Sequence, residues 1–348
     1  MAYRKPFGHK SGGGLSPATR ITQEIIARLE AGTKPWIQPW RGVPISRPLR
    51  ACGIPYRGMN VFWLWMVSDL CGYASPYWMT YNQAKSLGAQ VKKGEKSTIA
   101  IFYKSYTKEV EAPGTGEKSD EARRVLKAYP VFNADQVEGL PERYHPAASL
   151  DLVEPTIEPG GREAELDVFF AAIPAMLRHQ GGEAYYEPGA DRITMPPAHL
   201  FGGFDHYYAT LAHELSHWTG HPSRLARDLK NRFGTAAYAA EELIAELSSA
   251  MLGAELGLPV THLDSHASYI EHWLKLLRQD DRAILTAAAK AEEASSLLLK
   301  LGGRVIADGG IGEPPPQRSQ PEGGRHGPIG QLSQRRSRCV HRARGRGR

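Results

Sequence analysis

The segment "TLAHELSHWTGH", residues 210–221, holds the side chains whose types and spacing point most directly to chemistry. His213 and His217 are four residues apart, so on a helix both imidazoles project from one face and can reach a single ion. Glu214 lies about 100° further round such a helix than His213, which makes it a better base than ligand. The HExxH spacing therefore predicts a metal centre with Glu214 as its general base.

A third ligand is needed, because a catalytic zinc site takes three protein ligands and leaves one position for water. The later segment "EELIAEL" offers Glu242 and Glu246, which are again four residues apart. One of them would bind the ion, and the other would accept a hydrogen bond from a ligand histidine and fix its tautomer. The residues alone leave the order of the two open. His221 is a rival ligand, although Gly220 and Pro222 end the helix around it.

Zn²⁺ is the expected ion because imidazole favours it among cytosolic cations, with another divalent ion such as Mn²⁺ as the alternative. A site of this kind performs metal-assisted hydrolysis, in which Glu214 takes a proton from the attacking water. Tyr238 and His221 are the candidates for stabilising the developing oxyanion. The pattern indicates a zinc metallopeptidase domain and leaves open whether the peptidase is active.

The chain has 348 residues and 41% hydrophobic content, which is enough for two domains of ordinary size. It contains no run of roughly 18 apolar residues, the length that a membrane span needs, and its first residues lack the apolar core of a signal peptide. We therefore expect a cytoplasmic protein without a membrane partner. The three cysteines show no CxxC spacing, which argues against a disulfide framework and a thiolate zinc finger.

Charge is unevenly distributed along the chain. Residues 1–110 carry 16 lysines and arginines against 5 acidic residues, whereas residues 111–310 carry 18 against 30. Residues 311–348 are again basic, with 9 against 2. Basic segments at both ends of an acidic centre indicate a polyanionic partner for the ends and a different role for the centre.

Helical periodicity and capping residues predict the elements of the first half. Ser16 and Pro17 are typical of the N-cap and first position of a helix, which Gly32 ends. The proline-rich stretch 33–58 is expected to be an extended loop pinned by its aromatic side chains. Beyond it the pattern predicts a helix at 59–72, a short helix within 79–89, a strand at 97–109 and a hairpin excursion at 107–124.

The second half is predicted to be mainly helical, with a small sheet in front of the helix that carries the two histidines. Helices are expected at 162–182, 204–221 and 236–258, one or two more within 265–301, and two short strands within 183–197. A Pro- and Gly-rich stretch places the domain boundary near residue 155. The domains are then 16–150 and 155–303, between a disordered leader at 1–15 and a disordered Arg/Pro/Gly-rich tail at 308–348.

The first half combines basic residues with aromatic ones, a combination typical of proteins that bind single-stranded nucleic acid. Positive charges follow the phosphates, and bases stack on aromatic rings at roughly 1–3 kcal/mol each. About half of the aromatic side chains should instead belong to the core of so small a domain. The sharpest candidates are the lysines of the Gly-containing turn "VKKGEK". The predicted DNA-binding residues are Lys92, Lys93, Lys96, Arg41, Arg57, Trp36 and Trp40, within a wider set that includes Arg47, Tyr81 and Tyr103.

The chain resembles the ArdC-type antirestriction proteins of conjugative plasmids. "KPWIQPW", "YRGMN", "WMTYNQAKSLGAQVKKGEK" and "VFNADQ" are similar to that family's N-terminal single-stranded DNA-binding domain, which also occurs in plasmid primases. "HELSHWTGHPSRL" and "EELIAEL" are similar to its zincin-type metallopeptidase domain. The resemblance covers roughly residues 14–300 and does not extend to the Arg-rich end.

The resemblance carries several implications for fold and site. It implies an α+β protein of two domains, a mixed α/β ssDNA-binding domain and a mainly helical zincin-like domain with a small sheet. In zinc peptidases with a glutamate as third ligand, the pattern ExxA followed by an acidic or amide residue marks the ligand at its first position. This pattern implies that Glu242 is the ligand and Glu246 the hydrogen-bonding partner.

The implied function is to protect incoming plasmid DNA from host restriction during conjugation. Two alternatives stay open, a DNA-localised zinc metalloprotease that cleaves a host protein such as a restriction enzyme, and a primase or replication accessory factor.

Overall fold

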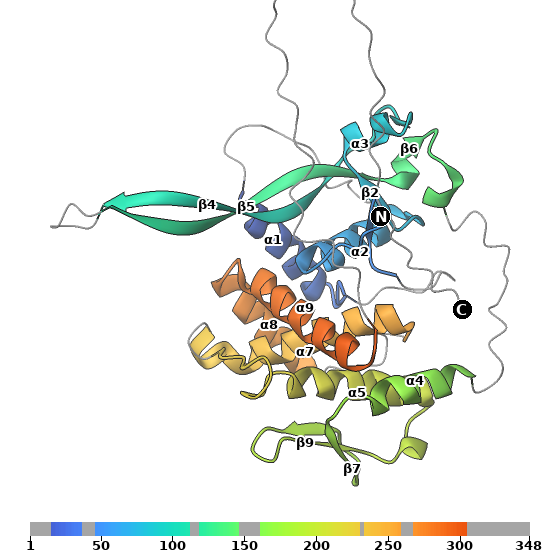
Figure 1. The fold of residues 1–348 in the computed structure, drawn as a ribbon, viewed down its shortest axis with the longest axis vertical. Coiled ribbons are helices and arrows are strands. Elements are labelled where there is room, and N and C mark those ends of the chain that lie inside the picture. The colour runs from blue at the N-terminus through green and yellow to red at the C-terminus, as the bar shows by residue number, and fades with distance from the viewer. Residues whose placement is uncertain are drawn as a thin grey trace, which may run out of the picture. The chain divides into compact units, whose positions relative to one another are not determined.

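The computed structural model describes residues 15–36, 46–111, 118–145, 161–229, 233–258 and 267–304. The expected leader up to residue 14, the tail from residue 308 and the domain boundary near residue 155 lie outside them. Within the described residues, short sheets and helices alternate in the first half and helices dominate the second (Figure 1). The α+β class predicted from the sequence is confirmed.

The first helix, α1 (Pro17–Glu30), begins and ends where its capping residues predict. The Ser16 hydroxyl accepts a hydrogen bond from the backbone N–H of Thr19 at 3.1 Å, which satisfies one of the free donors of the first turn. Ile21, Ile25 and Leu29 form one buried stripe on the helix. That stripe packs into a core that contains residues of both halves of the chain.

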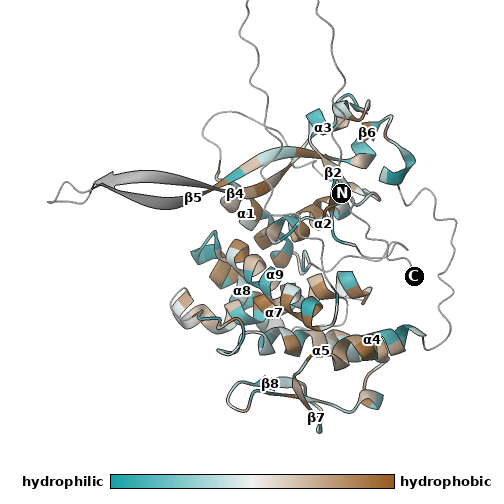
Figure 2. Ribbon diagram, in the orientation of Figure 1, coloured by the Kyte–Doolittle hydropathy of each residue, from teal (hydrophilic) through white to brown (hydrophobic). Residues whose placement is uncertain are grey.

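The N-terminal sheet has the strand order β1-β2-β5-β4. Its long hairpin, β4 (Thr98–Glu111) with β5 (Lys118–Asn133), pairs antiparallel throughout, as expected for a hairpin excursion. Strand β2 (Tyr77–Met79) adds antiparallel to β5, and β1 (Leu49–Arg50) adds parallel to β2. Helix α2 (Met59–Cys71), buried along most of its length, packs against β4 (Figure 2).

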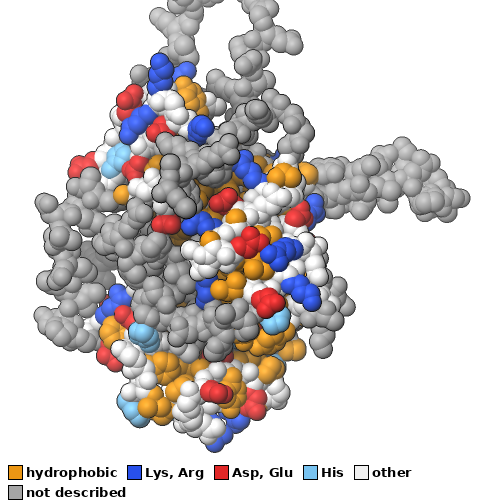
Figure 3. Space-filling model, turned by 180° about the vertical axis from the view of Figure 1, so that it is seen from behind, with side chains coloured by type: hydrophobic (Ala, Val, Ile, Leu, Met, Phe, Trp, Pro, Cys, Tyr) orange, Lys and Arg blue, Asp and Glu red, His pale blue; other side chains and the backbone are white. Residues whose placement is uncertain are grey.

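Small elements present the predicted lysine turn. Helix α3 (Tyr81–Ser86) starts with a capping box on Thr80, and β3 (Gln90–Val91) pairs with β6 (Val137–Glu138). The 3₁₀ turns η1 (Ala134–Gln136) and η2 (Glu142–Tyr144) follow β5 and β6. Basic side chains, with acidic ones between them, mark the surface at the top of Figure 3. The turn at residues 92–96 connects β3 to β4.

The second half begins with one departure from the sequence prediction. The helix expected at 162–182 ends early: α4 covers Gly161–Ala171, and Met176–His179 is strand β7. Pro174 explains the break, because proline lacks the N–H that a continuing helix would need. Strand β7 runs parallel to β9 (Arg192–Met195), and β8 (Tyr185–Glu187) pairs antiparallel on the other side. The two short strands expected within 183–197 are β8 and β9.

Four longer helices complete the second half: α5 (Phe204–Trp218), α7 (Ala237–Leu256), α8 (Ala267–Gln279) and α9 (Ala283–Leu301). Two 3₁₀ turns, η4 (Ala198–Leu200) and η5 (Gly234–Ala236), precede α5 and α7. Helix α7 is buried over most of its length and contacts both α5 and α9. Its many Ala, Ser and Gly residues let the neighbouring helices approach closely. Helix α7 is thus packed between α5 and α9.

Contacts join the two halves across the expected boundary. The ring of Trp36 meets that of Trp273 on α8 edge to face, with 5.5 Å between centroids. Arg47 is 2% exposed, and its guanidinium lies 2.8 Å from Glu292 on α9 and 2.7 Å from Glu255 on α7. A buried charge needs such partners. Residues near the start of the chain are therefore held directly by the C-terminal helices.

Among the described residues, no helix combines the length and the apolarity needed to cross a lipid bilayer.

Candidate metal centre

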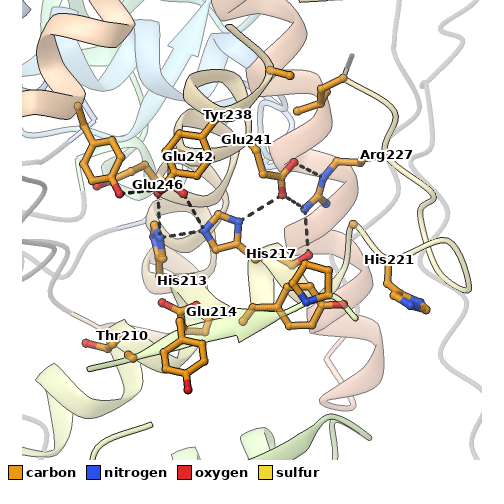
Figure 4. A pocket seen from close by; sticks show the side chains of 18 of the residues that line it. Thr210, His213, Glu214, His217, His221, Arg227, Tyr238, Glu241, Glu242 and Glu246 are labelled. Atoms are coloured by element: carbon orange, nitrogen blue, oxygen red, sulfur yellow. Dashed lines mark hydrogen bonds and ion pairs between the residues drawn. The ribbon is translucent and has the colours of Figure 1, made fainter. Parts of the chain in front are cut away.

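Helices α5 and α7 bring the predicted ligands together. His213 and His217 lie one turn apart on α5, with 3.2 Å between their Nε2 atoms. Glu242 on α7 places one carboxylate oxygen 3.8 Å from Nε2 of His213 and the other 3.7 Å from Nε2 of His217. One ligand atom from each residue lies within 4.8 Å of the others, and the three side chains converge in Figure 4. Two imidazole nitrogens and a carboxylate oxygen in this arrangement match the donor set of a three-ligand divalent metal site.

His221, the rival third ligand, stands apart from this group. It follows the end of α5 and lies away from the three converging side chains (Figure 4). Its Nδ1 accepts a hydrogen bond from the backbone N–H of Ser223 at 3.2 Å. The helix ends before residue 221, as Gly220 and Pro222 predict.

Glu241 supports His217 in a way that sequence reasoning missed. Nδ1 of His217 lies 3.3 Å from Oε1 of Glu241, and Arg227 holds the same carboxylate through contacts of 2.5 and 3.1 Å. Burial alone would raise the pKa of Glu241, but the hydrogen bonds from His217 and Arg227 lower it to about 2. A carboxylate of this kind fixes the ring so that Nε2 would face a bound ion. The available signal was the first glutamate of "EEL", directly before Glu242.

The role predicted for Glu246 requires a correction. Its carboxylate is buried, but its Oε1 lies 3.5 Å from Nζ of Lys34, and its Oε2 has no hydrogen-bond partner among the described residues. Nδ1 of His213 is likewise buried without such a partner there. Glu246 therefore does not accept a hydrogen bond from a ligand histidine in this structure. The carboxylate that does is Glu241, one position before the ligand.

Glu214 lines the same cleft as the three ligands. The cleft has a volume of about 1210 Å³, and Glu214 is 7% exposed at its inner side. Tyr185 and Tyr186 of β8 also line the cleft, together with Tyr238 and Tyr269. The Tyr238 hydroxyl lies 3.0 Å from that of Tyr269. A water molecule and a small or extended substrate could therefore reach both the ligands and Glu214.

The electrostatics of the cleft favour a cation. Burial would lower the pKa of His213, but the carboxylates of Glu242, Glu214 and Glu246 raise it. Burial would raise the pKa of Glu242, whereas the two histidines lower it. Negative charge thus surrounds the imidazoles on several sides. A bound divalent cation would neutralise that charge directly.

The predicted DNA-binding residues divide into several groups. Lys93 and Lys96 are exposed at the turn after β3, and Nζ of the exposed Lys92 donates a hydrogen bond to the backbone oxygen of Asp135 at 2.8 Å. Arg57 is half-buried and has partners of its own. Trp40 and Arg41 lie outside the described residues. Of the predicted DNA-binding residues that the structure describes, the three lysines of this turn are the ones exposed to solvent.

Trp36 and Arg47 require corrections. Trp36 is 1% exposed and packs on Trp273, so its ring faces the core and cannot stack on a base. Arg47 is equally buried and serves the ion pairs with Glu292 and Glu255. The exposed aromatic side chains of this half include Tyr81 and Tyr103, each 46% exposed.

Two family models match the two halves of the chain. The model described as "N-terminal domain of anti-restriction factor ArdC" matches residues 16–132. The model described as "Zincin-like metallopeptidase" matches residues 164–290, which include His213, His217 and Glu242.

Similar proteins cover both halves at once. "Uncharacterized protein y4eC" of Sinorhizobium fredii (strain NBRC 101917 / NGR234) is 40% identical over 280 residues, which are 79% of this chain and 88% of that protein. A "DNA primase TraC" of Escherichia coli is 39% identical over 307 residues, 83% of this chain. The match spans only 27% of that primase.

Solved structures give the most specific comparison. The metal-free crystal structure of "Antirestriction ArdC protein from R388 plasmid" is 44% identical, with a TM-score of 0.69, and the match covers 83% of this chain and 98% of that one. The Mn(II)-bound structure of the same protein is 42% identical, with a TM-score of 0.65 and the same coverage. The two family models match both halves of the chain, and the identity to the solved relative extends over almost all of that protein. The chain therefore belongs to the ArdC-type antirestriction family.

Proposed function

We propose that this chain is an antirestriction protein that binds single-stranded DNA and protects incoming DNA from host restriction during conjugation, and that its C-terminal half carries a divalent metal centre. Family membership supports the antirestriction role. The basic N-terminal half, with its exposed lysine turn, supports the DNA partner. The domains proposed for these roles are 16–150 and 155–303.

One observation supports the metal centre above all others. Ligand atoms of His213, His217 and Glu242, on two helices that pack together, lie within 4.8 Å of one another. Zn²⁺ is the ion proposed on ligand chemistry, and the Mn(II)-bound relative supports Mn²⁺ as an alternative. When bound, the ion would supply a Lewis acid to the cleft.

The protein's own groups can then be assigned roles. His213, His217 and Glu242 hold the ion, and Glu241 with Arg227 keeps the His217 ring in its binding orientation. Glu214 accepts a proton from water that attacks a substrate carbonyl, and later returns it to the leaving group. Its buried position next to the ligands keeps it from being fully hydrated. These roles are those of a metal-dependent hydrolase.

On the DNA side, Lys92, Lys93 and Lys96 would contact phosphates. Tyr81 on α3 and Tyr103 on β4 offer exposed rings for stacking, and they replace Trp36 in this role. Arg57, Trp40 and Arg41 remain candidates from the sequence alone.

A second function is favoured by Glu214. A centre that only stabilises the fold needs no base, so its presence in the cleft supports a DNA-localised metalloprotease that cleaves a host protein such as a restriction enzyme. The similarity to two-domain segments of DNA primases named TraC supports a role as a replication accessory factor. That role predicts association with a polymerase or helicase.

The discriminating experiment uses conjugation into a restricting recipient. The unaltered protein should raise the recovery of transferred plasmid, measured against a non-restricting recipient. Glu214→Ala should keep the fold and the metal, so full protection by this variant would assign the function to DNA shielding. Loss of protection, with DNA and metal binding retained, would assign it to hydrolysis. No protection by the unaltered protein would contradict the antirestriction role.

A further inference from the structure

The buried carboxylate of Glu246 has a cation from the other half of the chain as its neighbour. Glu246 lies one helical turn after Glu242 on α7 and is 2% exposed. Its Oε1 is 3.5 Å from Nζ of Lys34, whose side chain is itself only 10% exposed. An ionised carboxylate buried without a counter-charge is strongly unfavourable. The lysine therefore compensates the charge of a carboxylate that lines the cleft.

Lys34 is held in this position by the segment that follows α1. The backbone N–H of Thr33 donates to the oxygen of Arg28 at 2.9 Å, which closes the end of the helix. Two residues after Lys34, the buried ring of Trp36 is anchored against Trp273 on α8. The lysine thus sits between two fixed points. Because the backbone is fixed on both sides, the ammonium group is held beside Glu246.

The carboxylates of the cleft differ in whether a basic side chain neutralises them. Glu241 is neutralised by Arg227 through contacts of 2.5 and 3.1 Å. Glu242, Glu214 and Glu246 all act electrostatically on His213, and of these Glu246 has the ion pair with Lys34. A lysine and a divalent cation near one carboxylate repel each other. The same lysine that stabilises the cleft without metal must weaken its attraction for metal.

We propose that Lys34 is the counter-ion of Glu246 in the metal-free protein, and that it lowers the affinity of the His213, His217 and Glu242 centre for divalent cations. The N-terminal half then sets the metal affinity of the C-terminal half. This inference rests on the proposed metal centre. Its consequence has a definite sign: removing the lysine charge tightens metal binding and destabilises the metal-free protein.

The test uses the full chain and Mn²⁺ alone, titrated calorimetrically into metal-free protein. Lys34→Met keeps the length of the side chain and removes its charge. We expect the dissociation constant for Mn²⁺ to fall by about three- to tenfold, since one unit charge is removed near the ion. The melting temperature of the metal-free variant should fall as well. Lys290→Met is the matched control, because Lys290 also forms an ion pair, 2.8 Å from Glu293, but on the exposed surface.

Further variants keep the inference testable if Lys34→Met does not fold without metal. Lys34→Arg keeps the charge and should bind Mn²⁺ as the unaltered protein does. In a Glu246→Gln background, Lys34→Met should no longer lower the melting temperature, because the carboxylate that needs the counter-charge is gone. It should still tighten Mn²⁺ binding relative to Glu246→Gln alone.

Two results would overturn the inference: unchanged or weaker Mn²⁺ binding by Lys34→Met, or an equal loss of stability from Lys34→Met in both backgrounds. His213→Ala distinguishes these from failure of the metal centre. If His213→Ala loses Mn²⁺ while Lys34→Met binds it unchanged, only the role of Lys34 is wrong. If His213→Ala binds Mn²⁺ as tightly as the unaltered protein, the metal centre itself is wrong, and with it the inference that rests on it.

Discussion

Nδ1 of His217 on α5 lies 3.3 Å from Oε1 of Glu241 on α7, and Arg227 holds that carboxylate from its other side. The proton on Nδ1 is thereby fixed, and Nε2 is left as the atom that can bind an ion. Two neighbouring glutamates on α7 thus approach the same histidine differently: Glu241 lies at its Nδ1, and Glu242, the proposed ligand, lies 3.7 Å from its Nε2.

Glu241→Gln should weaken divalent metal binding. The amide keeps the size of the side chain but loses the charge that fixes the imidazole, and such partners contribute about 10- to 100-fold to metal affinity. Calorimetric titration with Mn²⁺ measures the change. Glu271→Gln, on the exposed side of α8, is the control and should bind as the unaltered protein does. Equal affinity of Glu241→Gln and the control would contradict the role of Glu241.

The Asp191–Arg224 pair should make stability depend on pH in a defined window. Hydrogen bonds from Arg224, at 2.5 and 2.9 Å, lower the pKa of Asp191 to about 2 from its usual 3.8. Arg224 also stacks over Trp218, so the pair ties the end of α5 to the turn before β9. A lowered carboxyl pKa means that stabilisation is complete above pH 3.8 and is lost as the pH falls towards 2.

Asp191→Asn tests this expectation. Because the carboxylate is partly exposed and screened, the stabilisation is on the order of 1 kcal/mol. Denaturant titrations at several pH values should show the variant less stable at pH 6, with the difference shrinking between pH values of about 4 and 2. A difference that stays constant over that range would show that the pair does not depend on the Asp191 charge.

Replacement of Lys92, Lys93 and Lys96 by alanine should weaken binding of a single-stranded oligonucleotide. Each lost phosphate contact should reduce the salt-dependence slope of the binding constant by about 0.7. Fluorescence anisotropy at several salt concentrations gives the slope. Lys275→Ala, on α8 in the C-terminal half, serves as the control. An unchanged slope for the triple variant would remove these lysines from the interface.

Trp36 and Tyr81 should give opposite results when each is changed to alanine. Trp36→Ala removes a buried ring from the core and should reduce the free energy of unfolding by about 3–5 kcal/mol. Tyr81→Ala removes an exposed ring, so it should leave stability nearly unchanged and weaken oligonucleotide binding by about 1–3 kcal/mol. Thermal unfolding and anisotropy separate the two. Loss of DNA binding by a fully stable Trp36→Ala protein would instead support Trp36 as a DNA-binding residue.

Local spacing predicted most of the elements and the separation of the two candidate ligand histidines, because helix geometry is a local property. The capped start of α1 at Ser16 and Pro17 and the one-turn separation of His213 and His217 follow from short-range rules. The family pattern added the choice of Glu242 over Glu246 as ligand. Its carboxylate converges on both histidines in the structure.

Contacts between segments far apart in the chain could not be predicted from local sequence patterns. Glu246 was expected to accept a hydrogen bond from a ligand histidine, but among the described residues its ion pair is with Lys34, more than 200 residues earlier in the chain. Trp36 stands in a basic, proline-rich segment that is typical of a binding loop, and only the packing of α8 shows that its ring is buried. Pairings of this kind depend on how α7 and α8 meet the N-terminal segment, which no local pattern encodes.

A single divalent ion held jointly by α5 and α7 is central to the proposed function. Crystals of the protein grown with Mn²⁺ and measured for anomalous scattering test this directly. We predict one strong peak per chain, at about 2.0–2.3 Å from Nε2 of His213, Nε2 of His217 and an oxygen of Glu242. No peak between these three side chains, or a peak only at other residues, would contradict the account.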